Sequence, residues 1–169
     1  AKLMSGRHEF LGGVTDTRFM RGRLSLDTIT LPQALKTAGY ATGFFGKWHL
    51  GMGWPFEAEP ADFYPGGFRR DRASDDMDLE ASDEQRARWR EAFSKPTTGG
   101  PTTRGFDHYF GVDVPNWPPY CFIENDRTAG IPSEYGSPGL FAKNQASQQG
   151  PALRTRQASG RESLRGAAA

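Results

Sequence analysis

Residues 39–51 read Gly-Tyr-Ala-Thr-Gly-Phe-Phe-Gly-Lys-Trp-His-Leu-Gly, and this stretch decides the fold. A short apolar run, Tyr40–Phe45, lies between two glycines and predicts a buried β-strand. Lys47 and His49 follow two residues apart. If the loop stays extended, both side chains lie on one side of the backbone and Trp48 lies on the other. A cation beside an imidazole at the carboxyl end of a strand suits an oxyanion site, although a surface lysine and a half-buried histidine would show the same spacing.

The segment before this strand predicts a helix. Thr30 can cap a helix that begins at Leu31, Pro32 suits its first turn, and Gly39 can end it in the left-handed conformation. The apolar residues at helical spacing are Leu31, Ala34, Leu35 and Ala38. A helix, a buried strand and a polar loop make up half of an α/β crossover unit. The sequence therefore predicts an α/β fold with a parallel or mixed sheet flanked by helices.

Composition limits the size of the core and the kinds of partner. Of the 169 residues, 36% are hydrophobic, and 21 Gly with 12 Pro indicate long irregular loops. The aromatic content of 12% argues against disorder over most of the length. The net charge is +1 and no basic motif is interleaved with aromatic residues, so we expect no nucleic-acid partner. No apolar run is long enough to cross a bilayer, and we expect no membrane partner.

Charge and cysteine usage suggest the domain organisation. Residues 1–150 are predicted to form one folded domain with a variable insertion at 57–104, and residues 151–169 an Arg- and Ala-rich disordered tail. Cys121 is the sole cysteine, which excludes an internal disulfide and a cysteine-built metal site. It lies in an apolar run, and we expect it to be buried.

Two weaker patterns give further expectations. Within the insertion, Trp89 and Phe93 can anchor a short helix. The acidic residues before it lack the spacing of a calcium loop, so no metal ligand is assigned in this chain. Farther along, residues 106–110 predict a strand in which His108 shares a face with Phe106 and Phe110, as a core or rim histidine.

Three motifs together resemble one known family. Ala1–Arg7 is similar to the second half of a signature that begins Cys (or Ser)-x-Pro-Ser-Arg, Gly46–Gly51 to a second signature, and Gly105–Gly111 to a third landmark. They occur in the family's order, and the resemblance covers about residues 1–56 and 96–135. On these motifs the chain is identified as a member of the formylglycine-dependent sulfatases, within the alkaline phosphatase superfamily.

The resemblance implies a reaction and roles for particular residues. Members hydrolyse sulfate esters with a modified Cys or Ser, present as a hydrated aldehyde, and a calcium ion that neutralises the sulfate. Lys47 matches the lysine that bridges sulfate and nucleophile, and His49 the histidine that helps to expel the sulfate. Asn116 stands where many members have a sulfate-facing histidine, and is either a substituted substrate-binding residue or a turn residue. The implied partners are a sulfated carbohydrate or an aryl sulfate ester, the carbohydrate being favoured, and the implied location is periplasmic or extracellular.

The resemblance also predicts what the chain lacks. The Cys-x-Pro-Ser-Arg half of the first signature would end immediately before Ala1. The calcium ligands would lie upstream of it and beyond residue 150. We therefore expect a partial N-terminal sulfatase domain that carries neither the formylglycine residue nor the calcium ligands and is inactive alone. Two alternatives stay open: a nucleophile-free pseudoenzyme that binds sulfate or sulfated glycans, and a related phosphoesterase.

Overall fold

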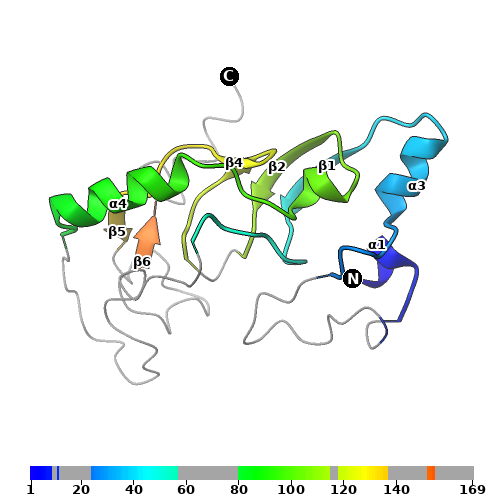
Figure 1. Ribbon diagram of the computed structural model, residues 1–169, viewed down its shortest axis with the longest axis horizontal. Helices are drawn as coiled ribbons and strands as arrows, with labels where there is room; N and C mark the ends of the chain where they lie inside the picture. Colours follow the sequence, from blue (N-terminus) through cyan, green and yellow to red (C-terminus); the bar gives the residue numbers. More distant parts are fainter. Residues whose placement is uncertain (9–10, 12–23, 57–79, 115–117, 137–151, 155–169) are drawn as a thin grey trace. The chain divides into compact units, whose positions relative to one another are not determined.

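The computed structural model describes part of the chain, and the rest is drawn as a grey trace in Figure 1. The described residues are 1–8, 11, 24–56, 80–114, 118–136 and 152–154. Two compact units are present. The first consists of Ala1–Pro55, Pro96–Val114 and Ile123–Arg127, and the second of Phe56–Lys95, Pro115–Phe122 and Thr128–Ala169. Asn116, the acidic residues Asp75, Asp76 and Asp78, and all but three residues of the predicted tail lie outside the described residues.

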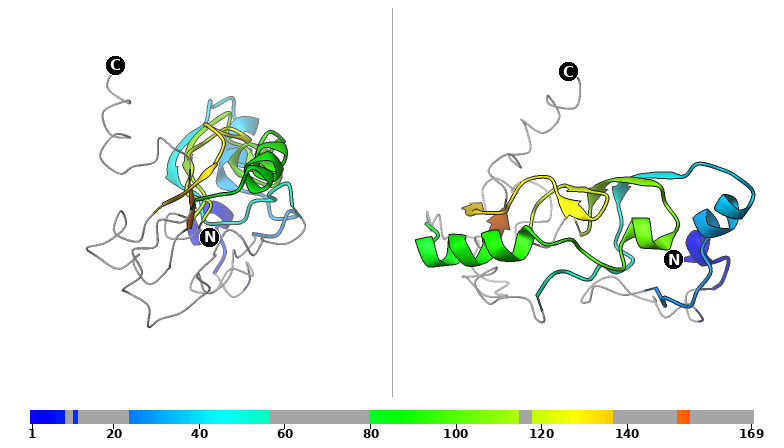
Figure 2. Two further views of the ribbon diagram at one scale, coloured as in Figure 1. Left: turned by 90° about the vertical axis from the view of Figure 1, so that its left-hand side faces the viewer. Right: turned by 45° about the horizontal axis from the view of Figure 1, so that its top comes forward.

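Two helices open the first unit. Helix α1 (Lys2–Ser5) ends at Gly6, whose N–H donates to the carbonyl of Lys2 at 2.8 Å. Helix α3 (Leu31–Thr37) has the predicted cap, since Thr30 is extended and its N–H donates to the Gln33 side chain at 2.8 Å. Gly39 follows with φ 82°, the left-handed conformation expected after a helix end. The predicted helix that begins at Leu31 is confirmed, and α1 and α3 lie side by side in Figure 2.

The predicted apolar stripe of α3 does not form a core face among the described residues. Leu31 is 43% exposed, and Ala34 and Ala38 are exposed as well. The buried residue of the helix is Pro32. The reason is that α3 packs through its amino end, where the Thr30 hydroxyl donates to the carbonyl of Arg104 at 2.6 Å.

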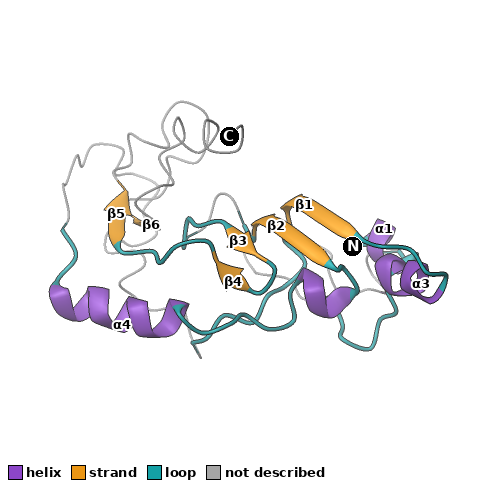
Figure 3. Ribbon diagram, turned by 90° about the horizontal axis from the view of Figure 1, so that it is seen from above, coloured by secondary structure: helices purple, strands orange, loops and turns teal. Residues whose placement is uncertain are grey.

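A mixed sheet forms the centre of the first unit. Strands β1 (Gly43–Lys47) and β2 (His108–Val112) pair in parallel, and β3 (Ile123–Glu124) pairs antiparallel to β2. With β4 (Arg127–Thr128) the strand order is β1-β2-β3-β4, as Figure 3 shows from above. The α/β class with a parallel or mixed sheet is therefore confirmed.

The prediction of a buried strand over Tyr40–Phe45 is wrong in two respects. The strand begins at Gly43, and only Phe44 among its residues is even half-buried, while Phe45 is 70% exposed. The physical reason is alternation: one face of the β1–β2 pair carries the core, and the opposite face is open among the described residues. Phe44 lies on the core side, stacked 5.7 Å from the ring of Tyr109.

Tyr109 is the central core residue of this unit and has no exposed surface. Its hydroxyl donates within 3.2 Å to the carbonyls of Gly46 and Val112, so it ties β1 to β2. Its N–H donates to the Asn125 side chain at 3.0 Å, which fixes the turn after β3. The buried residues of this core are Met4, Leu24, Trp48, Met52, Tyr109 and Ile123.

The sequence predicts His108 as a core or rim histidine, and the structure excludes the core position. His108 is exposed on the same face as Phe110, and its ring lies 5.5 Å from that of Phe45. Phe106 lies on the other side, where its ring contacts Phe44 at 5.3 Å. The alternation fails at Phe106 because β2 begins only at His108.

The second unit contains helix α4 (Asp83–Phe93) and a two-stranded sheet of β5 (Glu134–Gly136) and β6 (Ala152–Arg154). Trp89 and Phe93 are buried, as predicted, and the Trp89 ring meets Tyr135 edge-on at 5.4 Å. Cys121 is buried, also as predicted. Residues 152–154 of the predicted tail thus belong to a strand. None of the helices in the described segments is both long and apolar enough to span a membrane.

A polar network joins α3 to the start of β2. The carboxylate of Asp107 forms an ion pair with Lys36 at 2.5 Å and accepts from the N–H of Thr42 at 2.8 Å. The bond from Lys36, and then those from Thr42, lower the pKa of Asp107 from 3.8 to about 2. A 3₁₀ helix, η2 (Pro101–Arg104), precedes this corner and ends at Gly105. The network therefore fixes the entry of both parallel strands.

We expect the ionisation of Asp107 to make the free energy of unfolding depend on pH in the acid range. Since its pKa is lower in the folded chain, the ionised carboxylate stabilises the fold above pH 4, and this contribution is lost as the pH falls through about 2. Asp107→Asn should lower the free energy of unfolding at pH 7, and the difference from wild type should shrink between pH 4 and pH 2. Urea unfolding across this pH range measures it, and a difference that is constant with pH would contradict the assignment.

We expect Gly111→Ala to break the β1–β2 pair. Gly111 lies opposite Gly46, and a Cβ added at Gly111 would overlap the Gly46 carbonyl oxygen. The backbone on both sides is fixed, so the loss in unfolding free energy should be about 2–3 kcal/mol or more. Gly43→Ala, in β1 of the same strand pair, is the control, because its Cβ would meet mainly the movable ring of Phe45. Equal urea midpoints for the two variants would contradict this account.

Candidate functional site

Lys47 and His49 lie where β1 ends, on a backbone that continues to pair with the neighbouring strand. Lys47 is opposite Val112 in the parallel register. The N–H of Trp48 donates to the Val112 carbonyl at 2.9 Å, and the N–H of His49 donates to the Asp113 carbonyl at 3.1 Å. The two candidate residues are therefore on a hydrogen-bonded extension of the sheet, at the edge where open α/β sheets bind ligands.

Trp48 anchors this extension. Its indole is buried, and Nε1 donates to the carbonyl of Gly51 at 2.7 Å. The ring meets Phe44 edge-on at 5.7 Å and Phe106 at 6.3 Å. Lys47, by contrast, is exposed. The sequence correctly predicts that Trp48 turns away from Lys47.

His49 does not share the exposure of Lys47. It is only 9% exposed, and its φ of 51° lies in the left-handed region, which is uncommon for residues other than glycine. The extended backbone that would place His49 beside Lys47 therefore ends at His49 itself. The bond to Asp113 and the buried Trp48 hold this conformation, as the surroundings of a strained residue must.

Asp113 is a site residue that the sequence analysis missed. It is buried, its carbonyl accepts from His49, and its Oδ2 accepts from the indole Nε1 of Trp54 at 3.2 Å. Asp113 thus lies at the carboxyl end of β2, and its backbone is bonded to that of the histidine that follows β1. The signal that could have found it is its position directly after the second parallel strand.

Arg104 holds a loop that is bonded to the candidate site, and the sequence did not predict this role. Its guanidinium donates to the carbonyls of Ser25, Leu26 and Thr28 at 2.8–2.9 Å. Burial lowers the pKa of Arg104, an effect that Asp27 opposes. The loop held in this way donates from the Leu24 N–H to the carbonyl of Leu50, the residue after His49, at 2.9 Å. Arg104 therefore fixes the backbone that flanks the candidate site.

Lys47 and His49 are side chains of the kinds that can serve an anion. Lys47 supplies an exposed cationic side chain, and His49 an imidazole, a group that can donate or accept a proton. Within the described residues, no three His, Cys, Asp or Glu side chains gather in a way that could hold a metal ion. These residues do not fit a calcium site, so no chemical step is assigned to calcium. Asn116 cannot be placed, because it lies outside the described residues.

Comparison with known proteins gives concordant matches. The sequence model of the family described as Sulfatase matches residues 1–127. Arylsulfatase G of Canis lupus familiaris is 43% identical over 58 residues, which is 33% of this chain and 11% of the relative. Arylsulfatase A of Bos taurus is 58% identical over 33 residues, which is 20% of this chain and 6% of the relative. The chain thus spans about a tenth or less of the length of these relatives.

One solved structure also aligns with the chain. It comes from a study of the metabolism of multiple glycosaminoglycans by Bacteroides thetaiotaomicron. The alignment has a TM-score of 0.45 and 24% sequence identity, and it covers 76% of this chain and 20% of that chain.

We expect the backbone of His49 to limit which residues can replace it. Asn tolerates the left-handed conformation, whereas the β-branched Val does not, although Val is the more apolar residue at this buried position. His49→Val should therefore be less stable than His49→Asn by about 1–2 kcal/mol. Urea unfolding of both variants measures this. Greater stability of His49→Val would show that burial, and not φ, decides the position.

Proposed function

The chain belongs to the sulfatase family, and from this premise we propose that it supplies Lys47 and His49 to a site for sulfate ester hydrolysis. The observation that carries the proposal is the placement of both residues at the carboxyl end of a parallel strand, on backbone bonded to β2. The matched region, residues 1–127, includes this segment. The activity is proposed for the sulfatase as a whole.

Each residue has a role that its surroundings support. The exposed Lys47 carries a point charge on a flexible stem, suited to a sulfate oxygen that is charged before and after the reaction. His49 is held by its backbone N–H at the edge of a buried region, so its imidazole has a restricted position from which to donate a proton to the leaving oxygen. The same proposal includes Asn116 as a further residue that donates a hydrogen bond to a sulfate oxygen.

The proposal also concerns formylglycine and calcium, the two groups beside which Lys47 and His49 would act. In the family, formylglycine supplies the nucleophile as a hydrated aldehyde. Residues 1–169 contain no Cys-x-Pro-Ser-Arg or Ser-x-Pro-Ser-Arg sequence. We therefore infer that this polypeptide alone binds sulfate without hydrolysing an ester. Calcium is proposed only for the whole enzyme.

Substrate and location follow from family resemblance. We propose a sulfate ester as substrate, with a sulfated carbohydrate favoured over an aryl sulfate, and a periplasmic or extracellular location. The names of the relatives, arylsulfatases G and A, support the ester class but not the carbohydrate.

Lys47→Ala should weaken the binding of inorganic sulfate to the 169-residue chain about tenfold, because it removes a charge-assisted bond. Isothermal titration calorimetry at fixed ionic strength measures this, since surface charges are screened by salt. Lys95→Ala is the matched control. Lys95 is also an exposed lysine, but it lies in the second unit, just after α4, and forms an ion pair with Glu91 of that helix.

Several outcomes would count against the proposal. Equal effects of Lys47→Ala and Lys95→Ala would mean non-specific attraction. Binding of inorganic phosphate in clear preference to sulfate would favour the phosphoesterase alternative. Hydrolysis of 4-nitrophenyl sulfate by the purified chain would overturn the inference that these residues lack the nucleophile.

A further inference from the structure

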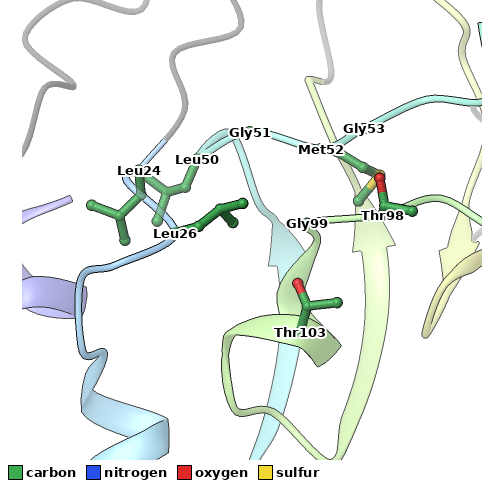
Figure 4. A pocket seen from close by; sticks show the side chains of 9 residues that line it. All are labelled: Leu24, Leu26, Leu50, Gly51, Met52, Gly53, Thr98, Gly99 and Thr103. Carbon is green, nitrogen blue, oxygen red and sulfur yellow. The ribbon is translucent and has the colours of Figure 1, made fainter.

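A cavity of about 300 Å³ lies in the first unit, beyond the carboxyl end of β1 (Figure 4). One side is lined by Leu24, Leu26 and Leu50, and the other by Met52 and Thr98 (Figure 4). No charged side chain is among the lining residues that the structure describes. The role proposed for Lys47 and His49, binding of a sulfate group, does not require an apolar cavity of this kind.

The walls are tied together by backbone hydrogen bonds. Leu24 donates to the carbonyl of Leu50 at 2.9 Å. On the other side, Gly53 and Thr98 exchange two bonds of 2.6 and 2.8 Å. The Arg104 guanidinium fixes the carbonyl of Leu26 at 2.9 Å. The cavity is therefore preformed, as small-molecule sites commonly are.

The lining selects a chemical class of ligand. Among the described lining residues are three glycines, which present backbone without a side chain, and two threonines, Thr98 and Thr103, whose hydroxyls are the polar side-chain groups of this set. A flat ring can lie between leucine side chains and a glycine-rich wall, and a single polar substituent can bond to a threonine. A sugar ring would leave several hydroxyls facing leucines without partners, at a cost for each. An apolar cavity of about 150 Å³ already binds benzene, so 300 Å³ can take one or two fused rings.

We propose that this cavity binds a flat aromatic ring that carries one hydrogen-bonding group, of the class of aromatic alcohols. The proposal needs no sulfate and does not depend on Lys47, so it stands apart from the proposed hydrolysis. Leu50, which lines the cavity, directly follows His49, so the cavity and the candidate anion site are formed by adjacent residues of the chain.

The test uses 1-naphthol and the 169-residue chain with ¹³C-labelled methionine methyl groups. Of the four methionine methyl signals, that of Met52, which lines the cavity, is the reporter, and that of Met4, a buried residue that is not among the lining residues, is the internal control. The ring current of bound naphthol should shift the Met52 signal saturably and leave that of Met4 in place. Met52→Leu assigns the reporter signal.

A matched pair of variants locates the binding. Leu26 is 72% exposed and lines the cavity, and Ile29 in the same loop is 76% exposed and does not. Neither substitution by Gln should unfold the chain, because both side chains are already largely in water. Leu26→Gln should weaken naphthol binding about fivefold, and Ile29→Gln should leave it unchanged.

The outcomes are distinguishable from those of the sulfate experiment. Absence of a saturable Met52 shift at millimolar naphthol, or equal weakening by the two Gln variants, overturns the proposal. Glucose binding as tightly as naphthol also overturns it, because the site would then not select an apolar ring. Lys47→Ala should not alter naphthol binding, so loss of sulfate binding in that variant leaves this result untouched.

Discussion

The close approach of β1 and β2 at Gly46 and Gly111 is the constraint on which the first unit depends. The two backbones come so near that a single Cβ at Gly111 would overlap the Gly46 carbonyl oxygen. Gly46 also has a φ of 123°, which side-chain-bearing residues rarely adopt. The parallel register, the Tyr109 bonds across it and the paired positions of Lys47 and Trp48 all follow from this contact.

From that register, local anchors decide what is exposed. Trp48 is buried and bonded to Gly51, so the chain must turn at His49, and the turn places the imidazole in a buried position while Lys47 stays in solvent. Arg104 is buried, and its guanidinium donates to three carbonyls of the loop before α3. Its fixed fork of donors suits that task better than a lysine would. The candidate anion site and the apolar cavity therefore share one rigid support.

Local signals predicted the helices well because their causes are local. Thr30, Pro32 and Gly39 act within a few residues, and α3 has the predicted cap and ending. The strand was harder: apolar residues on both faces of Tyr40–Phe45 suggested burial, yet Phe45 and Phe110 are exposed on the face opposite Tyr109. Which face receives a covering element depends on contacts distant in sequence, and no alternation pattern records them.

The sequence by itself determined the α/β class, the ends of α3 and the family, because the capping residues, the glycines and the three ordered motifs can be read directly from it. Lys47 and His49 could be singled out on the same basis. Only the tertiary structure decided that His49 is left-handed and buried, that Asp113 lies beside it, and that Arg104 holds the loop behind it. These facts depend on pairing between segments some sixty to eighty residues apart, where backbone geometry and burial, not spacing, fix each neighbour.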